Sequence, residues 1–125
     1  RMAGEGNPES PAKSTGNKMQ LFLELVEQYF RTTKGVSFYA EKLSITPNYL
    51  NMLCKKRFGR SAGDMITARI MIEAKRLLYH TESDIGQIAF ELGYDDPSYF
   101  TRAFKKAEQK TPTAFREEIY KKYQH

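Results

Sequence analysis

Cysteine and histidine are scarce in this chain, and their scarcity excludes several classes of protein. The 125 residues include one cysteine, Cys54, and two histidines, His80 and His125. A single thiol cannot form an intramolecular disulfide, so the sequence is typical of a reducing, cytoplasmic compartment. The same residues offer no zinc-ligand spacing and no cysteine–histidine pair for nucleophilic catalysis. We therefore expect no metal site and no thiol chemistry.

Long apolar runs and phosphate-binding motifs are also missing. No apolar stretch is long enough to span a membrane and no signal-peptide core begins the sequence, so we expect a segment without membrane contact. There is no glycine-rich phosphate loop and no carboxylate pair placed for acid–base work. The sequence therefore predicts neither an enzyme nor a cofactor-binding protein.

Length and charge limit what remains. With 40% hydrophobic and 13% aromatic residues in 125, the chain can bury one modest core. The formal net charge is +5 and the isoelectric point is about 9.3. This surplus suits a polyanionic partner, although plain soluble proteins also carry it.

The first seventeen residues differ from the rest in composition. The segment "RMAGEGNPESPAKSTGN", residues 1–17, is rich in Gly, Pro, Ser and Asn and has no apolar periodicity, which predicts a flexible linker or arm. Because the chain opens on Arg1 and a linker, we expect a fragment of a longer protein whose other part lies upstream. The folded domain is predicted over residues 18–125.

From Lys18 onward, apolar residues recur at helical spacing and no segment alternates as a strand does. Three helices are predicted to start with the same device, a capping residue followed by proline, at Thr46–Pro47, Asp96–Pro97 and Thr111–Pro112. We expect an all-α fold of about seven helices. The predicted core includes Leu21 in the first helix and Ile72 in a long helix that ends near His80.

Two segments of the chain repeat one pattern. "AEKLSITPNYLNMLCKK", from Ala40, and "AFELGYDDPSYFTRAFKK", from Ala89, share an alanine, a leucine, a turn, a proline, a tyrosine and a closing Lys-Lys. The second turn is one residue longer. A short helix, a tight turn and a second helix with basic residues is the pattern of a helix-turn-helix. We therefore predict two such motifs, at about 37–58 and 84–108, joined by a long central helix.

The two motifs, and above all "IAFELGYDDPSYFTRAFKKAEQKTPTAFR", closely resemble the carboxy-terminal DNA-binding domain of the AraC/XylS family of bacterial transcription regulators. The resemblance covers roughly residues 18–122. It implies sequence-specific binding to double-stranded promoter DNA, with each second helix in a major groove and the two grooves roughly 34 Å apart. It further implies contact with RNA polymerase, a monomeric isolated domain, and an upstream domain that senses a ligand or a phosphorylation signal.

The resemblance also transfers roles to single residues. The DNA-binding positions of the two motifs fall on Pro47, Asn48, Asn51, Met52, Lys55 and Lys56, and on Pro97, Ser98, Thr101, Arg102, Lys105 and Lys106. Arg102 can donate twice to guanine O6 and N7, and Asn48 or Asn51 could pair with an adenine edge. Met52 departs from the arginine frequent in the family, and its thioether can make only apolar contact, for example with a thymine methyl group.

Simpler interpretations remain open beside these roles. Arg102 could be a solvated surface arginine, and the lysines could be exposed helix ends that the helix dipole favours. Tyr94 and Tyr99 are interpreted as packing aromatics, and Cys54, in place of a family aromatic, as a small buried residue. Two other functions stay possible: a helical protein-interaction module without sequence-specific DNA binding, and a nonspecific basic DNA binder.

Overall fold

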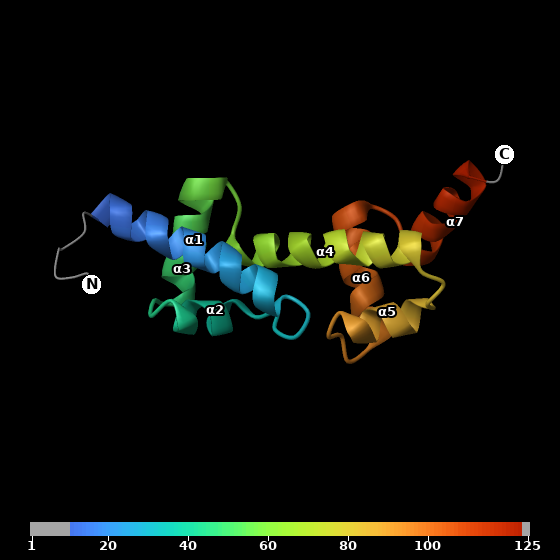
Figure 1. Ribbon diagram of the computed structural model, residues 1–125, viewed down its shortest axis with the longest axis horizontal. Coiled ribbons are helices and arrows are strands. Elements are labelled where there is room, and N and C mark those ends of the chain that lie inside the picture. Colours follow the sequence, from blue (N-terminus) through green and yellow to red (C-terminus); the bar gives the residue numbers. More distant parts are fainter. Residues whose placement is uncertain (1–10, 124–125) are drawn as a thin grey trace. The chain divides into compact units, whose positions relative to one another are not determined.

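The computed structural model describes residues 11–123, and over this range the chain forms seven helices and no strand (Figure 1). The helices are α1 Pro11–Tyr29, α2 Val36–Lys42, α3 Pro47–Phe58, α4 Ala62–His80, α5 Ile85–Glu91, α6 Pro97–Glu108 and α7 Pro112–Lys122. The predicted all-α fold is confirmed. However, α1 begins at Pro11 and not near Lys18, so part of the segment predicted as a linker is helical. Residues 1–10 of that segment lie outside the described residues.

Internal contacts divide the chain into two units. Unit 1 takes in the chain as far as Gln28 together with Gly35–Gly63, and therefore holds most of α1, with α2 and α3. Unit 2 takes in Tyr29–Lys34 and the chain from Asp64 onward, and therefore holds most of α4, with α5, α6 and α7. Each unit contains one of the two predicted motifs.

Unit 1 has its core between α1 and the helix pair α2 and α3. The rings of Phe22 and Tyr39 meet edge to face with centroids 5.9 Å apart, and both side chains are fully buried. Met19, Phe22 and Val26 form the buried stripe of α1. Leu21, predicted in that stripe, is 50% exposed, so its placement in the core is wrong. The buried stripe runs through Met19 and Phe22, and the helical period places residue 21 off that face.

Unit 2 is built around aromatic rings. Phe100 lies 5.4 Å from Tyr94 and 5.9 Å from Phe104, and Phe104 lies 5.6 Å from Phe115, between ring centroids. The side of α4 that belongs to this core carries Ile70, Met71, Ala74, Leu77 and Leu78. Ile72 is 58% exposed, which contradicts its predicted burial. One residue past Met71, it has turned by about 100° away from the buried face.

The turn between the first two helices begins with the same backbone in both motifs. Ser44 and Gly93 occupy equivalent places and both have a left-handed backbone, with φ of 59° and 83°. The residue after each of them donates its N–H to the carbonyl of Ala40 or Ala89 at 3.0 Å. Both alanines are completely buried, which allows the second helix to cross closely. The predicted duplication is thus present down to single hydrogen bonds.

The predicted helix starts are confirmed by their caps. The side chains of Thr46, Asp96 and Thr111 each accept an N–H from the second or third residue of α3, α6 or α7, at 2.9–3.1 Å. A proline follows each cap. The two second helices also end alike, because Gly59 after α3 and Gln109 after α6 are left-handed, with φ of 76° and 65°. Position and length of α3 and α6 are therefore fixed locally.

Gly93 is packed against the loop that follows α1. A Cβ at this position would lie 2.2 Å from the carbonyl oxygen of Arg31 and 2.7 Å from Nζ of Lys34. Burial lowers the pKa of the Lys34 ammonium, while the nearby Asp95 carboxylate raises it. The turn of the second motif thus rests directly on the backbone of residues 29–34.

A buried carboxylate on α4 secures the same loop. Glu73 is 4% exposed and accepts hydrogen bonds from the guanidinium groups of Arg76 and Arg31. The hydrogen bond from Arg76, opposed by burial and assisted by Arg31, lowers the pKa of the Glu73 carboxyl. The folded state therefore favours the ionised form of Glu73.

Gly93→Ala and Gly59→Ala form a matched pair of substitutions, since both glycines have positive φ but only Gly93 is crowded. Gly59→Ala should cost about 1 kcal/mol, the strain of a left-handed alanine. Gly93→Ala should cost about 3 kcal/mol or more, because the new methyl group meets a carbonyl oxygen. Urea unfolding of both variants measures this; equal losses would contradict the close packing of Gly93.

Glu73→Gln tests the buried ionised carboxylate through its pH dependence. A lowered pKa means that Glu73 stabilises the fold above its unfolded pKa and loses this contribution as pH falls through its folded pKa. The variant should be less stable than the wild type by about 1–2 kcal/mol at pH 7. The difference should shrink below pH 4 in urea unfolding experiments. A difference that is constant from pH 7 to pH 3 would mean that Glu73 is not ionised.

Candidate nucleic-acid interface

Helices α3 and α6 display the predicted DNA-binding residues at equivalent places. Ten of the twelve are exposed and two are half-buried. The exposed ones are Pro47, Asn48, Met52, Lys55, Lys56, Pro97, Ser98, Arg102, Lys105 and Lys106; the half-buried ones are Asn51 and Thr101. Asn48, Met52 and Lys55 follow one another at four- and three-residue steps, so they share one side of α3. Ser98, Arg102 and Lys105 repeat this arrangement on α6.

The unpaired charges of these two helices are all positive. Helix α3 carries Lys55, Lys56 and Arg57 in its last turn and no acidic residue. The one acidic residue of α6, Glu108, is paired with Lys75 of α4 at 3.2 Å. Within residues 11–123, none of the four lysines at the ends of α3 and α6 forms an ion pair. They are therefore available to meet an anionic partner.

Asn51 has a structural role that the sequence pattern did not reveal. Its Oδ1 accepts the N–H of Ala62, the first residue of α4, at 2.9 Å. Bidentate pairing with adenine requires both the oxygen and the nitrogen of the amide. The equivalent residue of α6 is Thr101, and the helix that follows begins with Pro112, which has no N–H. Asn51, but not Thr101, is thus tied to a backbone donor.

The surface of α6 contains one contact that the sequence interpretation missed. Tyr99 is 58% exposed, so it is not the packing aromatic that was predicted, whereas Tyr94 does pack on Phe100. The Cζ atom of Arg102 lies 4.8 Å from the centroid of the Tyr99 ring. In α3 the same two places hold Tyr49 and Met52, which are 40% and 54% exposed.

Two further basic residues were not included in the predicted site. Arg57 and Arg60 follow the paired lysines of α3 and are exposed. The signal was present in the sequence as the run "KKRFGR", in which Gly59 ends the helix. Both residues extend the positive charge at the end of α3 beyond Lys56.

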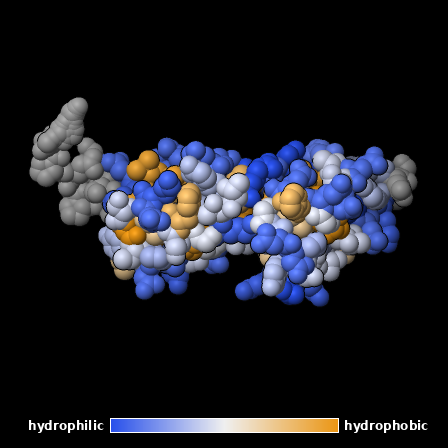
Figure 2. Space-filling model, turned by 90° about the horizontal axis from the view of Figure 1, so that it is seen from below, coloured by the Kyte–Doolittle hydropathy of each residue, from blue (hydrophilic) through white to orange (hydrophobic). Residues whose placement is uncertain are grey.

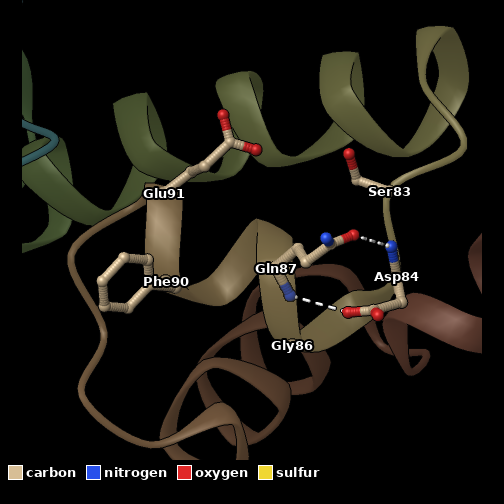
Figure 3. A pocket seen from close by; sticks show the side chains of 6 residues that line it. All are labelled: Ser83, Asp84, Gly86, Gln87, Phe90 and Glu91. Carbon is tan, nitrogen blue, oxygen red and sulfur yellow. Dashed lines mark hydrogen bonds between the residues drawn. The ribbon is translucent and has the colours of Figure 1, made fainter.

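A hollow lies beside α5. It is lined by Ser83, Asp84, Gly86, Gln87, Phe90 and Glu91 (Figure 3). Two of these residues hydrogen-bond each other, because Asp84 accepts the N–H of Gln87 at 2.8 Å and Gln87 accepts the N–H of Asp84 at 3.0 Å. This pair forms the capping box of α5. Asp84 and Gln87 of the hollow therefore serve the start of α5.

Other chemistries find no support among residues 11–123. No group of three potential metal ligands occurs there. Cys54 is completely buried, as predicted, and burial raises the pKa of its thiol to about 11, which makes it a poor nucleophile. No described helix is long and apolar enough to cross a bilayer.

On the face drawn in Figure 2, hydrophilic residues cover most of the described surface and hydrophobic residues form separate patches.

Two helix-turn-helix units, each with a capped, exposed and basic second helix, define a class of DNA-binding fold. Comparison with known proteins identifies the family within this class. Residues 39–118 match a family described as a helix-turn-helix domain, and the chain belongs to this AraC-type family of DNA-binding domains of transcription regulators. The expected absence of an enzyme activity agrees with this family.

Individual relatives support the assignment. The regulatory protein PocR of Salmonella typhimurium is 29% identical over 103 residues, which are 82% of this chain and 34% of PocR. The solved C-terminal domain of the two-component response regulator yesN from Fusobacterium nucleatum is 34% identical, with a TM-score of 0.75 over 80% of this chain and 98% of that one. The solved DNA-binding domain of AdpA, in complex with a target DNA, shares the fold, with a TM-score of 0.72 over 88% and 96% of the two chains at 14% identity. The chain spans about a third of the length of PocR.

Asn48→Ala and Asn51→Ala separate the exposed amide from the structural one. Asn51→Ala leaves the Ala62 N–H without its acceptor and should cost about 1–2 kcal/mol of stability. Asn48→Ala removes an exposed side chain and should change the free energy of unfolding by less than about 0.5 kcal/mol. Urea unfolding measures both. Equal stability of the two variants would refute the role of Asn51 in holding the start of α4.

Proposed function

We propose that this domain binds duplex DNA sequence-specifically, with α3 and α6 each entering a major groove. The observation that carries the proposal is the duplicated pair of exposed, capped helices whose free charges are all basic. The major groove of B-DNA is about 12 Å wide and admits one α-helix, while the phosphates on either side attract basic groups. Two such helices call for two patches of recognised bases, about one helical turn or roughly 34 Å apart.

Arg102 is the base-reading residue that we assign first. Its guanidinium is exposed and forms no ion pair within the described residues. It can therefore donate two hydrogen bonds to O6 and N7 of a guanine. Ser98, one turn earlier on the same side of α6, can bond a neighbouring base or phosphate.

The first motif would read different bases. Asn48 is the better candidate for an adenine, because Oδ1 of Asn51 is already bound to the start of α4. Met52 offers only apolar contact, which suits a thymine methyl group. The proline at the start of each helix, Pro47 or Pro97, lies beside these residues and would pack against the DNA.

The remaining basic residues would contact phosphates. Lys55 and Lys56 on α3, with Lys105 and Lys106 on α6, lie in the last turns of their helices. Each phosphate that they neutralise should make the slope of log affinity against log salt more negative by about 0.9. A nonspecific binder would show the same salt dependence. Unrelated duplex would then compete for the domain as well as the selected site does.

A relative suggests the context in which this domain acts. The Lactose operon transcription activator of Staphylococcus xylosus is 34% identical over 70% of this chain, which is 32% of that protein. By analogy we infer that this domain belongs to a longer regulator whose upstream part senses a ligand or a phosphorylation signal. We further infer that this regulator acts in the bacterial cytoplasm and contacts RNA polymerase at promoters. We also infer that the isolated domain is monomeric, which sedimentation equilibrium tests. A gel shift of the promoter complex by purified RNA polymerase tests the polymerase contact.

Arg102→Ala and Lys106→Ala test the division between base and phosphate contacts. The preferred site is first found by selecting bound duplexes from a random pool at low and moderate salt. Arg102→Ala should lose about 1–3 kcal/mol of binding free energy on that site and lose preference at one base pair. Lys106→Ala should weaken all sequences similarly and make the salt slope shallower by about 1.

Binding constants from fluorescence anisotropy on the selected site and on its single-base variants provide the readout. Unchanged affinity of Arg102→Ala for its best site would show that Arg102 does not read a base. A selection that enriches one patch of bases in place of two would mean that α3 does not contribute to specificity. No enrichment at all would contradict the proposed function.

A further inference from the structure

We propose that Tyr99 is a positioning residue that holds the Arg102 guanidinium ready for base recognition. The proposal rests on the proposed function, in which Arg102 reads a guanine. The two residues lie one turn apart on α6, and Cζ of Arg102 is 4.8 Å from the centroid of the Tyr99 ring. Both are exposed, and Tyr99 contributes 58% of its surface to solvent. An exposed aromatic ring at this place is not explained by core packing.

The geometry favours recognition because stacking and hydrogen bonding use different parts of the guanidinium. Its N–H donors lie in the plane of the group, so a ring that contacts the guanidinium through one face would leave the edge free to donate. A free arginine samples many rotamers and loses this freedom when it binds a base. A guanidinium already held by Tyr99 loses less, so its contact with guanine becomes stronger.

No other group competes for Arg102 within residues 11–123. Arg31 and Arg76 are both held by the carboxylate of Glu73. Arg102 has no carboxylate partner there, and its described interaction is with the ring of Tyr99. The side chain is therefore restrained without being neutralised, which is the state that a reader of guanine needs.

The duplication supplies an internal control. Tyr49 occupies the place of Tyr99 in α3 and is 40% exposed, but Met52 stands where Arg102 does. Removal of the Tyr49 ring therefore releases no guanidinium, because residue 52 is a methionine. Tyr49→Leu therefore reproduces the loss of an exposed tyrosine from a second helix without the proposed effect.

The experiment compares Tyr99→Leu, Tyr99→Phe and Tyr49→Leu on the selected duplex and on duplexes changed at the guanine that Arg102→Ala identifies. Tyr99→Leu should reduce discrimination in favour of guanine by about two- to fivefold, the size of an exposed cation–π contact. Tyr99→Phe keeps the ring and should stay within about twofold of the wild type. Tyr49→Leu should leave this discrimination unchanged. Circular dichroism checks that α6 stays helical.

Two results would overturn the proposal in different ways. Wild-type discrimination by Tyr99→Leu would show that the ring does not position Arg102. An equal loss of affinity from Tyr99→Leu in the wild-type and Arg102→Ala backgrounds would show that Tyr99 contacts the DNA itself. A wild-type domain that enriches no sequence would instead contradict the proposed function, so the two failures are distinguishable.

A gain of specificity provides the converse test. In Met52→Arg, the new guanidinium is one turn from Tyr49, as Arg102 is from Tyr99. A second round of duplex selection should show a new guanine in the patch read by α3. Combination with Tyr49→Leu should weaken that preference by about two- to fivefold. The same preference with and without the Tyr49 ring would contradict the positioning role.

Discussion

One residue in the left-handed backbone region sets the geometry of each motif. Ser44 and Gly93 reverse the chain so that the next N–H returns to the carbonyl of Ala40 or Ala89. This bond closes the turn while the buried alanine lets the second helix approach without a side chain between them. The turn therefore helps to set the direction of α3 and α6, and with it the side that their exposed residues face. Backbone geometry places these residues before any side chain contributes.

The two turns meet different requirements. Gly93 lies against the carbonyl oxygen of Arg31, where no Cβ fits, whereas the equivalent Ser44 carries a side chain. The loop that crowds Gly93 is held by Glu73, whose buried charge is balanced by two guanidinium groups. A charge in this place depends on its partners, because an unpaired buried carboxylate would be costly. The second motif therefore depends on residues far outside its own sequence.

Much of this organisation could be predicted from the sequence, since it follows from local rules. Capping residues with proline at the first helical position define the starts of α3, α6 and α7, and the repeated pattern revealed the two motifs. What could not be predicted depends on contacts between distant residues. Leu21 and Ile72 are apolar, but the face that a helix buries is decided by the partner that covers it. The hydrogen bond between Asn51 and Ala62 was missed for the same reason, because it joins α3 to the start of the next helix. The contact of Tyr99 with Arg102 was missed because the sequence does not give the direction of either side chain.

The first residue of the helix that follows α3 or α6 also limits how α3 or α6 can evolve. Ala62 keeps an N–H that needs an acceptor, and Asn51 supplies it, whereas Pro112 has none and makes no such demand on Thr101. A lineage that exchanged Ala62 for proline would remove this demand and free residue 51 to vary. One that exchanged Pro112 for another residue would constrain residue 101. The two motifs can therefore diverge at unequal rates, and the residue at the start of the following helix decides which motif changes faster.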